Sequence, residues 1–288
     1  MLELMAPALV ASLVLIGLHG YMGIHIIARG VIFVDLALAQ VAAMGWAAAN
    51  LGPSEWLSTH LGVPEAAAGY ALGLGATLVA AALLAVSRME HEYVPQEAII
   101  GIVYVVASAG TILLAAQAPR GSEHVEQLLT GSLLWVTWPE IARTAAVYLA
   151  IGGAHWFLRE RFLVISLNPK LAADRGWSVP VWDFTFYMLF GLMVTISVAI
   201  AGVLVVFSFL VIPAVIAFLF TSRPSALITI AWGTGTIATL LGLYFSYVSD
   251  LPTGPLVVCF FAAALIAAFI VRALLVRKRP AIPAARSR

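Results

Sequence analysis

A succession of apolar runs, each about as long as a lipid bilayer is thick, dominates this sequence. The hydrocarbon core of a bilayer is about 30 Å thick, so a helix needs roughly 20 apolar residues to cross it. Eight runs meet that length, at residues 3–27, 31–50, 65–87, 97–117, 139–158, 180–200, 226–247 and 255–276. Since 62% of the residues are hydrophobic and 10% are charged, we predict an all-α, polytopic transmembrane helical bundle.

A ninth apolar run, residues 203–220, is interrupted, because Gly202 precedes it and Pro213 lies inside it. Proline removes a helical hydrogen bond, so this run is either a kinked span or a short half-helix. Residues 123–136 are too short and too polar to cross, and we expect them to form an interfacial helix. The N-terminal run lacks a basic start and a cleavage pattern, so we interpret it as the first span and not as a removed signal.

Basic residues orient the predicted bundle, since Lys and Arg near helix ends stay on the cytoplasmic side. If nine crossings alternate, Arg120 and Arg143 fall outside and every other basic residue falls inside. This scheme makes the N-terminus external and the C-terminus cytoplasmic. We expect a transmembrane domain over residues 1–276, with a cytoplasmic loop at 159–180 and a basic cytoplasmic tail at 277–288.

The sequence excludes several functions. It contains no GxxxxGK[ST] phosphate-binding loop and only two lysines, so the chain does not hydrolyse a nucleotide by that route. If transport is driven by ATP, another chain must supply the ATPase. The net charge of +1 gives no bias toward nucleic acid, and the lone Cys259 has no disulfide partner.

The connection at residues 159–180 is the longest predicted cytoplasmic loop and the most polar part of the chain. Asn168 and Pro169 predict the N-cap and first residue of a short helix, which Gly176 ends. A short amphipathic helix on this side can dock in a groove of a partner protein. On physical grounds alone, a loop that merely satisfies the positive-inside rule is the alternative.

An acidic residue, Asp35, lies among the apolar residues of "GVIFVDLALAQVAAMG", residues 30–45. A carboxylate at membrane depth costs roughly 2.5–3.5 kcal/mol on insertion scales, so we expect it to face the bundle interior or a water pathway and to have a partner. The candidate partners are Gln40, His25 and Arg29. Asp35 is therefore either a group in a cation pathway or a structural partner of Arg29 or of a helix end.

Other polar residues are weaker candidates for binding a metal. A neutral amide binds transition metals poorly, so Gln40 favours an interhelical hydrogen bond. His25 can ligate, although a histidine near the end of a membrane helix is more often a packing residue, and His19 lies six residues away on another face. His124 either receives an ion outside or ends a solvated helix. Glu97 begins a helix, where its charge complements the helix dipole, and its role beyond that is open.

Six segments follow one another in a specific order and spacing. They are RGVIFVDLALAQVAAMG at 29–45, EAIIGIVYVVASAG at 97–110, VEQLLTGSLLWVTWPEI at 125–141, LNPKLAADRGW at 167–177, VAIAGVLVVFSFLVIPAVIA at 198–217 and DLPTGPLVV at 250–258. Over about residues 10–275 the chain resembles the membrane permeases of metal-ion ATP-binding-cassette (ABC) importers, which import zinc, manganese or ferrous iron.

The resemblance implies an assembly and a location. It implies a permease homodimer in the bacterial inner membrane, two copies of a separate ABC ATPase, and an extracytoplasmic metal-binding protein that delivers the ion. The divalent metal ion is then the transported substrate, no cofactor is permanently bound, and this chain is not itself an enzyme. The resemblance also implies that a coupling helix inserts into the ATPase, formed by Lys170, Leu171, Ala172, Ala173, Asp174, Arg175 and Gly176.

The family's second helix commonly carries Gly-Asp-x-x-x-His, whose Asp and His lie about 40° apart on one helix face and can ligate one cation. Here Asp35 keeps the Asp position, but the His position falls on Ala39. If the motif is counted back from Gly45 instead of forward from Arg29, Gln40 takes the His position and Leu36 the Asp position. Asp35 and Gln40 lie about 140° apart on an α-helix and share a face only across a π-bulge. The predicted metal residues are Asp35, Gln40 and His25, a set that departs from the family's pattern.

The leading hypothesis is an importer permease that works by alternating access and is driven by separate ATPases. The alternatives are an ABC permease for a metal chelate, an ion-coupled secondary transporter, and a non-transporting membrane scaffold. An inverted internal repeat would favour the secondary transporter, and we find no convincing one in the sequence.

Overall fold

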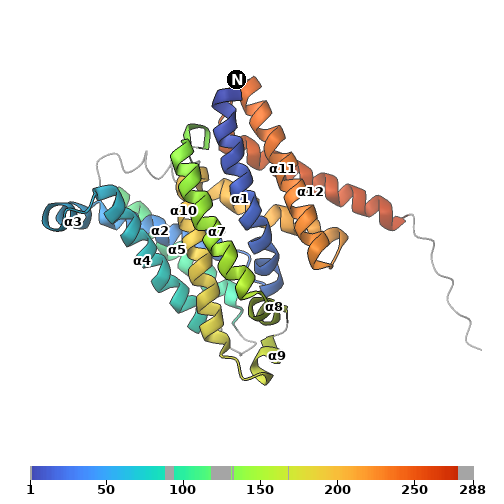
Figure 1. Cartoon of the computed structure of the whole chain (residues 1–288), viewed down its shortest axis with the longest axis horizontal. Coiled ribbons are helices and arrows are strands. Elements are labelled where there is room, and N and C mark those ends of the chain that lie inside the picture. The colour runs from blue at the N-terminus through green and yellow to red at the C-terminus, as the bar shows by residue number, and fades with distance from the viewer. Residues whose placement is uncertain (1, 88–93, 118–130, 132, 168, 278–288) are drawn as a thin grey trace, which may run out of the picture.

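The computed structural model describes residues 2–87, 94–117, 131, 133–167 and 169–277, and these residues form a bundle of helices (Figure 1). The helices are α1 (Leu2–Arg29), α2 (Val34–Ala49), α3 (Pro53–Leu61), α4 (Glu65–Val86), α5 (Gln96–Ala115), α7 (Trp138–Phe157), α8 (Arg159–Leu167), α9 (Pro169–Asp174), α10 (Val179–Phe220), α11 (Pro224–Ser249) and α12 (Thr253–Arg277), with a 3₁₀ turn, η1 (Leu133–Trp135). The predicted all-α transmembrane class is confirmed.

Each predicted long run coincides with a helix within a few residues at either end, except that 180–200 forms the first part of α10, which continues to Phe220. Six of the helices are long and apolar enough to cross a membrane, and α2 with α3 makes a seventh candidate that is bent by 61°. Helix α7 matches the predicted span 139–158 but does not belong to that apolar group. The number of crossings and the orientation of the termini therefore remain predictions.

Two helices were not predicted. Helix α3 follows α2 after a short turn at Gly52, whose φ of 136° a side chain disfavours, and Pro53 begins it. Helix α8 follows α7 almost directly, so residues 159–167, which we expected to be loop, are helical. Of the predicted interfacial segment 123–136, residues 123–130 and 132 lie outside the described residues, and residues 133–135 form only one 3₁₀ turn. The basic tail lies outside the described residues from residue 278 onward.

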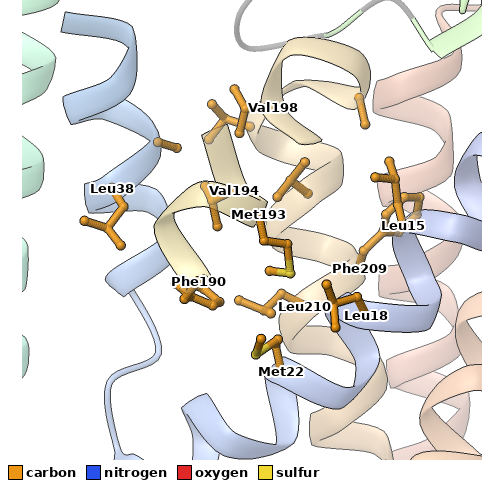
Figure 2. Close-up of a cluster of buried hydrophobic side chains, with 14 of the residues drawn as sticks. Leu15, Leu18, Met22, Leu38, Phe190, Met193, Val194, Val198, Phe209 and Leu210 are labelled. Atoms are coloured by element: carbon orange, nitrogen blue, oxygen red, sulfur yellow. The ribbon is translucent and has the colours of Figure 1, made fainter. Parts of the chain in front are cut away.

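Helices α1 and α10 form the centre of the bundle. Figure 2 shows Leu18 and Met22 of α1 beside Leu210 of α10, with Phe190 and Met193 of α10 completing the cluster. All five side chains are buried. Since lipid is as apolar as these side chains, close packing rather than exclusion of water holds such helices together.

Glycines allow the helix backbones to approach one another. A Cβ atom at Gly23 of α1 would overlap the backbone carbonyl of Leu210, and one at Gly45 of α2 would lie 2.9 Å from the carbonyl oxygen of Leu72 in α4. Gly73 of α4 faces the carbonyl oxygen of Ala42 in the same way, at 3.0 Å. The glycine-rich α4 therefore serves helix packing, as its composition predicts.

Helix α10 is broken at Gly202. Gly202 adopts φ 78° and ψ 159°, a conformation that belongs almost only to glycine, so the 42 residues of α10 form two helical segments. In Figure 2 the ribbon rises through Phe190 and Val198, turns, and returns through Phe209 and Leu210. The interruption predicted before residues 203–220 is thus confirmed, and it lies at the glycine and not at Pro213.

Candidate functional site

Asp35 lies in the first turn of α2 and is 1% exposed. The amide groups of Asp35 and Leu36 approach its carboxylate, as expected for an acid at a helix N-terminus. Its other oxygen, Oδ1, has no hydrogen-bond partner among the described residues. The prediction that Asp35 faces the protein interior is confirmed by its burial, and its place in the first turn puts the carboxylate at the N-terminal end of α2.

Glu97 holds the turn that leads into α2. Glu97 lies in the first turn of α5, and its Oε1 accepts a hydrogen bond of 2.6 Å from the backbone N–H of Ile32. The turn itself begins at Gly30, where φ is 68°. A carboxylate that accepts from a backbone amide forms a strong, charge-assisted bond. This bond supplies a role for Glu97 that the sequence left open.

Gln40 and Asp35 point to different sides of α2. Helix α2 is α-helical from Val34 to Ala49, without the π-bulge that would bring the two side chains onto one face. Asp35 is buried, whereas Gln40 is partly exposed. The pair therefore does not converge on one ion in this structure.

His25 of α1 is 3% exposed and lies next to α8. Its Nδ1 is 3.1 Å from Ser166 Oγ, and its ring meets the edge of Tyr21 at 4.8 Å. His19 is also buried, and its Nδ1 donates to the Leu15 carbonyl oxygen at 2.8 Å. In the part of the chain that the structure describes, no three His, Cys, Asp or Glu residues come together in a way that would hold a metal. The structure thus leaves Asp35, Gln40 and His25 apart, and their metal roles remain predictions.

A pocket of about 230 Å³ lies between α2, α4 and α10. Its lining consists of small, aromatic and hydroxyl side chains, without a charged residue among those described: Ala39, Ala42, Ala43, Trp46, Ala66, Gly69, Tyr70, Gly73, Thr195, Val198 and Ala199. Residues 35, 39, 42 and 46 follow one another at helical spacing, so Asp35 lies one turn from the pocket on the face of α2 that lines it. Ala39, one of the two positions on which the resemblance can place the family's histidine, is itself part of the pocket wall.

The predicted coupling segment forms α9 at the end of the molecule opposite to the N-terminus (Figure 1). After Asp174 the chain closes as a Schellman motif, because Gly176 N–H donates to the Ala173 oxygen and Trp177 N–H to the Ala172 oxygen. Gly176 has φ 72°, which confirms that it ends the helix. The predicted N-cap, Asn168, lies outside the described residues.

The surface of α9 is available to a partner. Lys170, Leu171, Ala173, Asp174, Arg175 and Gly176 are exposed, whereas Ala172 is fully buried and anchors the segment. An ion pair of 3.2 Å joins Arg175 Nη1 to Glu160 Oε1 and ties the end of α9 to the start of α8. The segment is thus a short projection, held against the bundle at Ala172.

The model of the ABC 3 transport family matches residues 1–272 of this chain. The chain belongs to the ABC 3 transport family. It is therefore a multi-pass membrane permease of a metal ABC importer, as its motifs predicted.

Relatives of this ABC 3 permease are metal transport proteins by name. It is 24% identical over 254 residues to a probable metal transport system membrane protein of Chlamydia muridarum, covering 88% of this chain and 84% of the relative. It is 27% identical over 202 residues to the manganese transport system membrane protein MntC of Listeria monocytogenes, covering 68% and 72%. Its fold is similar to that of PsaBC from Streptococcus pneumoniae in complex with Fab, with a TM-score of 0.75 at 22% identity over 96% and 95% of the two chains.

The fold brings together two groups of residues that the sequence did not predict to be close. His155 of α7, 1% exposed, packs its ring 6.4 Å from that of His25, and neither of its ring nitrogens has a hydrogen-bond partner among the described residues. Arg29 pairs with Asp183 of α10 at 2.6 Å. No local pattern links residues so far apart in the chain, so only a charged residue inside an apolar run, such as Asp183, could have signalled the pair.

Proposed function

We propose that this chain is the transmembrane permease subunit of an ABC importer for a divalent transition-metal ion, of the class of zinc, manganese or iron. It moves the ion by alternating access, and two copies of a separate ATPase supply the energy. A second permease copy, an extracytoplasmic metal-binding protein and the bacterial inner membrane complete the assembly. The permease carries out no covalent chemistry, so hydrolysis of ATP belongs to the partner chain.

The exposed, anchored helix α9 carries this proposal. Its sequence occurs where the family has its coupling helix, and its fold leaves Leu171, 38% exposed, on a polar end of the bundle beside Lys170 and Asp174. A short helix with one apolar contact flanked by charges fits a groove in a partner protein. Because the chain lacks a nucleotide-binding motif, an ATPase is the partner that a transporter of this family requires.

Co-purification tests the proposal. The double variant Leu171→Glu with Asp174→Lys should release the ATPase from the permease, because it reverses a charge and buries a carboxylate in the contact. This pair is preferable to a change at Gly176, where φ of 72° would strain any other residue. The matched control is Thr59→Glu with Glu55→Lys on exposed α3, which should retain the ATPase. Retention of a stoichiometric complex by the α9 variant would refute the docking role.

Asp35 is proposed to contribute to the ion pathway. A buried carboxylate with one oxygen unpartnered, one turn from a pocket on the same helix face, is positioned to attract a cation as the bundle opens. Gln40 and His25 remain lesser candidates, since one is partly exposed and the other is engaged by Ser166.

A metal chelate is the second candidate cargo, and the pocket favours it. A wall of small, aromatic and hydroxyl groups suits an organic ligand that already surrounds its metal, whereas a bare ion needs charged or imidazole ligands. Elemental analysis of metal-limited cells, with and without the transporter, separates the two when the metal is supplied as the free salt or as a chelate. A secondary transporter is tested by reconstituting the permease alone, which we expect to move no ions.

A further inference from the structure

We propose that Arg29 is a positioning residue that transmits movement of the ATPase-docking helix α9 to the pocket-lining helix α10. This inference rests on the proposed function, because it presumes that an ATPase acts on α9. It concerns a buried junction at the end of α1, defined here as Arg29, Ser166, Asp183 and Phe186.

The Arg29 side chain connects three helices at once. It lies at the end of α1 and is 1% exposed, and Asp183 of α10 is fully buried. Arg29 Nη1 donates to Asp183 Oδ1 at 2.6 Å, and Arg29 Nε donates to Ser166 Oγ of α8 at 2.8 Å. The guanidinium also lies over the Phe186 ring, with Cζ 3.8 Å from its centroid. Its planar fork thus fixes direction as well as distance between the helices.

Histidines on two helices pack against this junction. His25 lies one turn before Arg29 and shares Ser166, whose hydroxyl accepts from Arg29 and can donate to His25 Nδ1 at 3.1 Å. His155 of α7 meets the edge of the Phe186 ring, with ring centroids 5.7 Å apart, and stacks on Phe162 of α8 at 4.4 Å. The junction is therefore enclosed by α1, α7, α8 and α10, so α8 cannot shift without moving the groups around Arg29.

Movement of α9 reaches the junction through α8. One residue separates the two helices in the chain, the Glu160–Arg175 ion pair joins their far ends, and α9 contacts both α8 and α10. Ser166 lies in the last turn of α8, directly before α9. A force on α9 is thus applied one turn from the hydrogen bond between Ser166 and Arg29.

Helix α10 carries the movement to the pocket. Asp183 and the pocket residue Thr195 belong to the same helical segment, which has no break before Gly202. At 1.5 Å per residue they lie about 18 Å apart along the axis. An ion pair without access to water resists separation, since each partner would be left as an uncompensated charge. The ends of α1 and α10 that the ion pair joins therefore move together and do not slide past each other.

Replacing both charges should affect transport differently if the Arg29–Asp183 ion pair transmits movement than if it only stabilises the fold. Two buried charges can be replaced by apolar residues of similar volume without loss of stability, which removes the directional hydrogen bonds and leaves packing intact. The double variant Arg29→Met with Asp183→Leu makes this replacement. If the pair only stabilises the fold, a folded double variant will transport normally.

The test measures coupling in proteoliposomes that contain the permease, its ATPase and its binding protein. The probe is whichever of Mn²⁺, Zn²⁺ or Fe²⁺ the parent complex takes up. We expect the double variant to remain assembled and to hydrolyse ATP, while ions moved per ATP fall about fivefold or more. Arg29→Lys keeps the positive charge but loses the planar guanidinium group. Its ratio of ions moved per ATP should lie between those of the parent and the double variant. Arg159→Met, at an exposed arginine that stacks on Trp156, should match the parent.

The outcomes separate this inference from the proposed function. An unchanged ratio of ions to ATP in the double variant overturns the role of Arg29 and leaves the permease assignment intact. A parent permease that binds no ATPase overturns the proposed function itself. If the double variant does not assemble, Ser166→Ala decides, since it removes only the hydroxyl between α1 and α8. A lower ratio in Ser166→Ala then supports the proposal, and a parental ratio overturns it.

Discussion

The backbone of Gly131 lies directly against the peptide that joins Ala201 to Gly202, where α10 breaks. A Cβ atom at Gly131 would overlap the Ala201 carbonyl group and the Gly202 nitrogen. Both glycines adopt positive φ, 70° at Gly131 and 78° at Gly202. The segment before α7 therefore fits against the break in α10 because Gly131 has no side chain, and glycine at 202 permits the positive φ of the break.

Gly131→Ala should destabilise the permease through this contact. The added methyl group must displace the α10 backbone and also strains a positive φ, so we expect a loss of about 1–3 kcal/mol and a melting temperature lower by about 2–10 °C. Thermal unfolding of the purified permease in detergent measures it. Gly153→Ala in α7, where a Cβ meets nothing within 4 Å, is the control and should not lower the melting temperature, since alanine favours a helix more than glycine does. Equal melting temperatures for the two variants would show that the contact between Gly131 and the Ala201–Gly202 peptide has room for a methyl group.

Gly23→Ala should separate α1 from α10. The new Cβ would overlap the carbonyl of Leu210, so the two helices must move apart and lose van der Waals contacts along their length. We expect about 1–3 kcal/mol of destabilisation, seen as reduced thermal stability. Gly17→Ala tests the same helix where a Cβ has free space, and it should be at least as stable as the unmodified protein, since alanine favours a helix more than glycine does.

Asp35→Asn should lower metal uptake while the assembled complex persists. The substitution preserves volume and the amide contacts at the start of α2 but removes the negative charge, so a cation is attracted less strongly. We expect initial uptake to fall on the order of tenfold, measured as ion accumulated per assembled complex. Glu55→Gln, on the exposed α3, controls for loss of any carboxylate. Unchanged uptake kinetics would remove Asp35 from the pathway.

Glu97→Ala should weaken the entry to α2 without a specific effect on transport. The backbone N–H of Ile32 loses a charge-assisted bond of 2.6 Å, which costs about 1–3 kcal/mol. Glu97→Gln keeps a hydrogen-bond acceptor, so its loss of stability should be about half that of Glu97→Ala. Melting temperature and uptake per assembled complex are measured together. Normal stability with reduced uptake would instead place Glu97 in the ion pathway.

Local patterns predicted much of the fold and part of the candidate site. The apolar runs located the long helices, and glycine and proline located the break before residue 203 and the helix at Pro169–Asp174 with its end at Gly176. These features depend on a residue and its near neighbours, so the sequence contains them directly. Helix α3 escaped prediction because its nine residues include exposed polar groups and lie outside any long apolar run.

Partners across the bundle could not be predicted in the same way. Asp35 had three candidate partners near it in the chain, Gln40, His25 and Arg29, yet Arg29 pairs with Asp183, which lies on α10. Gln40 shares a helix with Asp35 but not a side of it, because α2 keeps its regular turn.

The amino-acid sequence by itself determined that this protein is a helical membrane bundle with a short helix that ends at Gly176 and a carboxylate inside the bundle, since hydrophobic length and capping act locally. Only the tertiary structure decided that Arg29 joins α1, α8 and α10, and that Gly131 abuts Gly202. The physical reason is that a buried charge or a close backbone contact selects its partner by position in space, and that position depends on how all the helices pack.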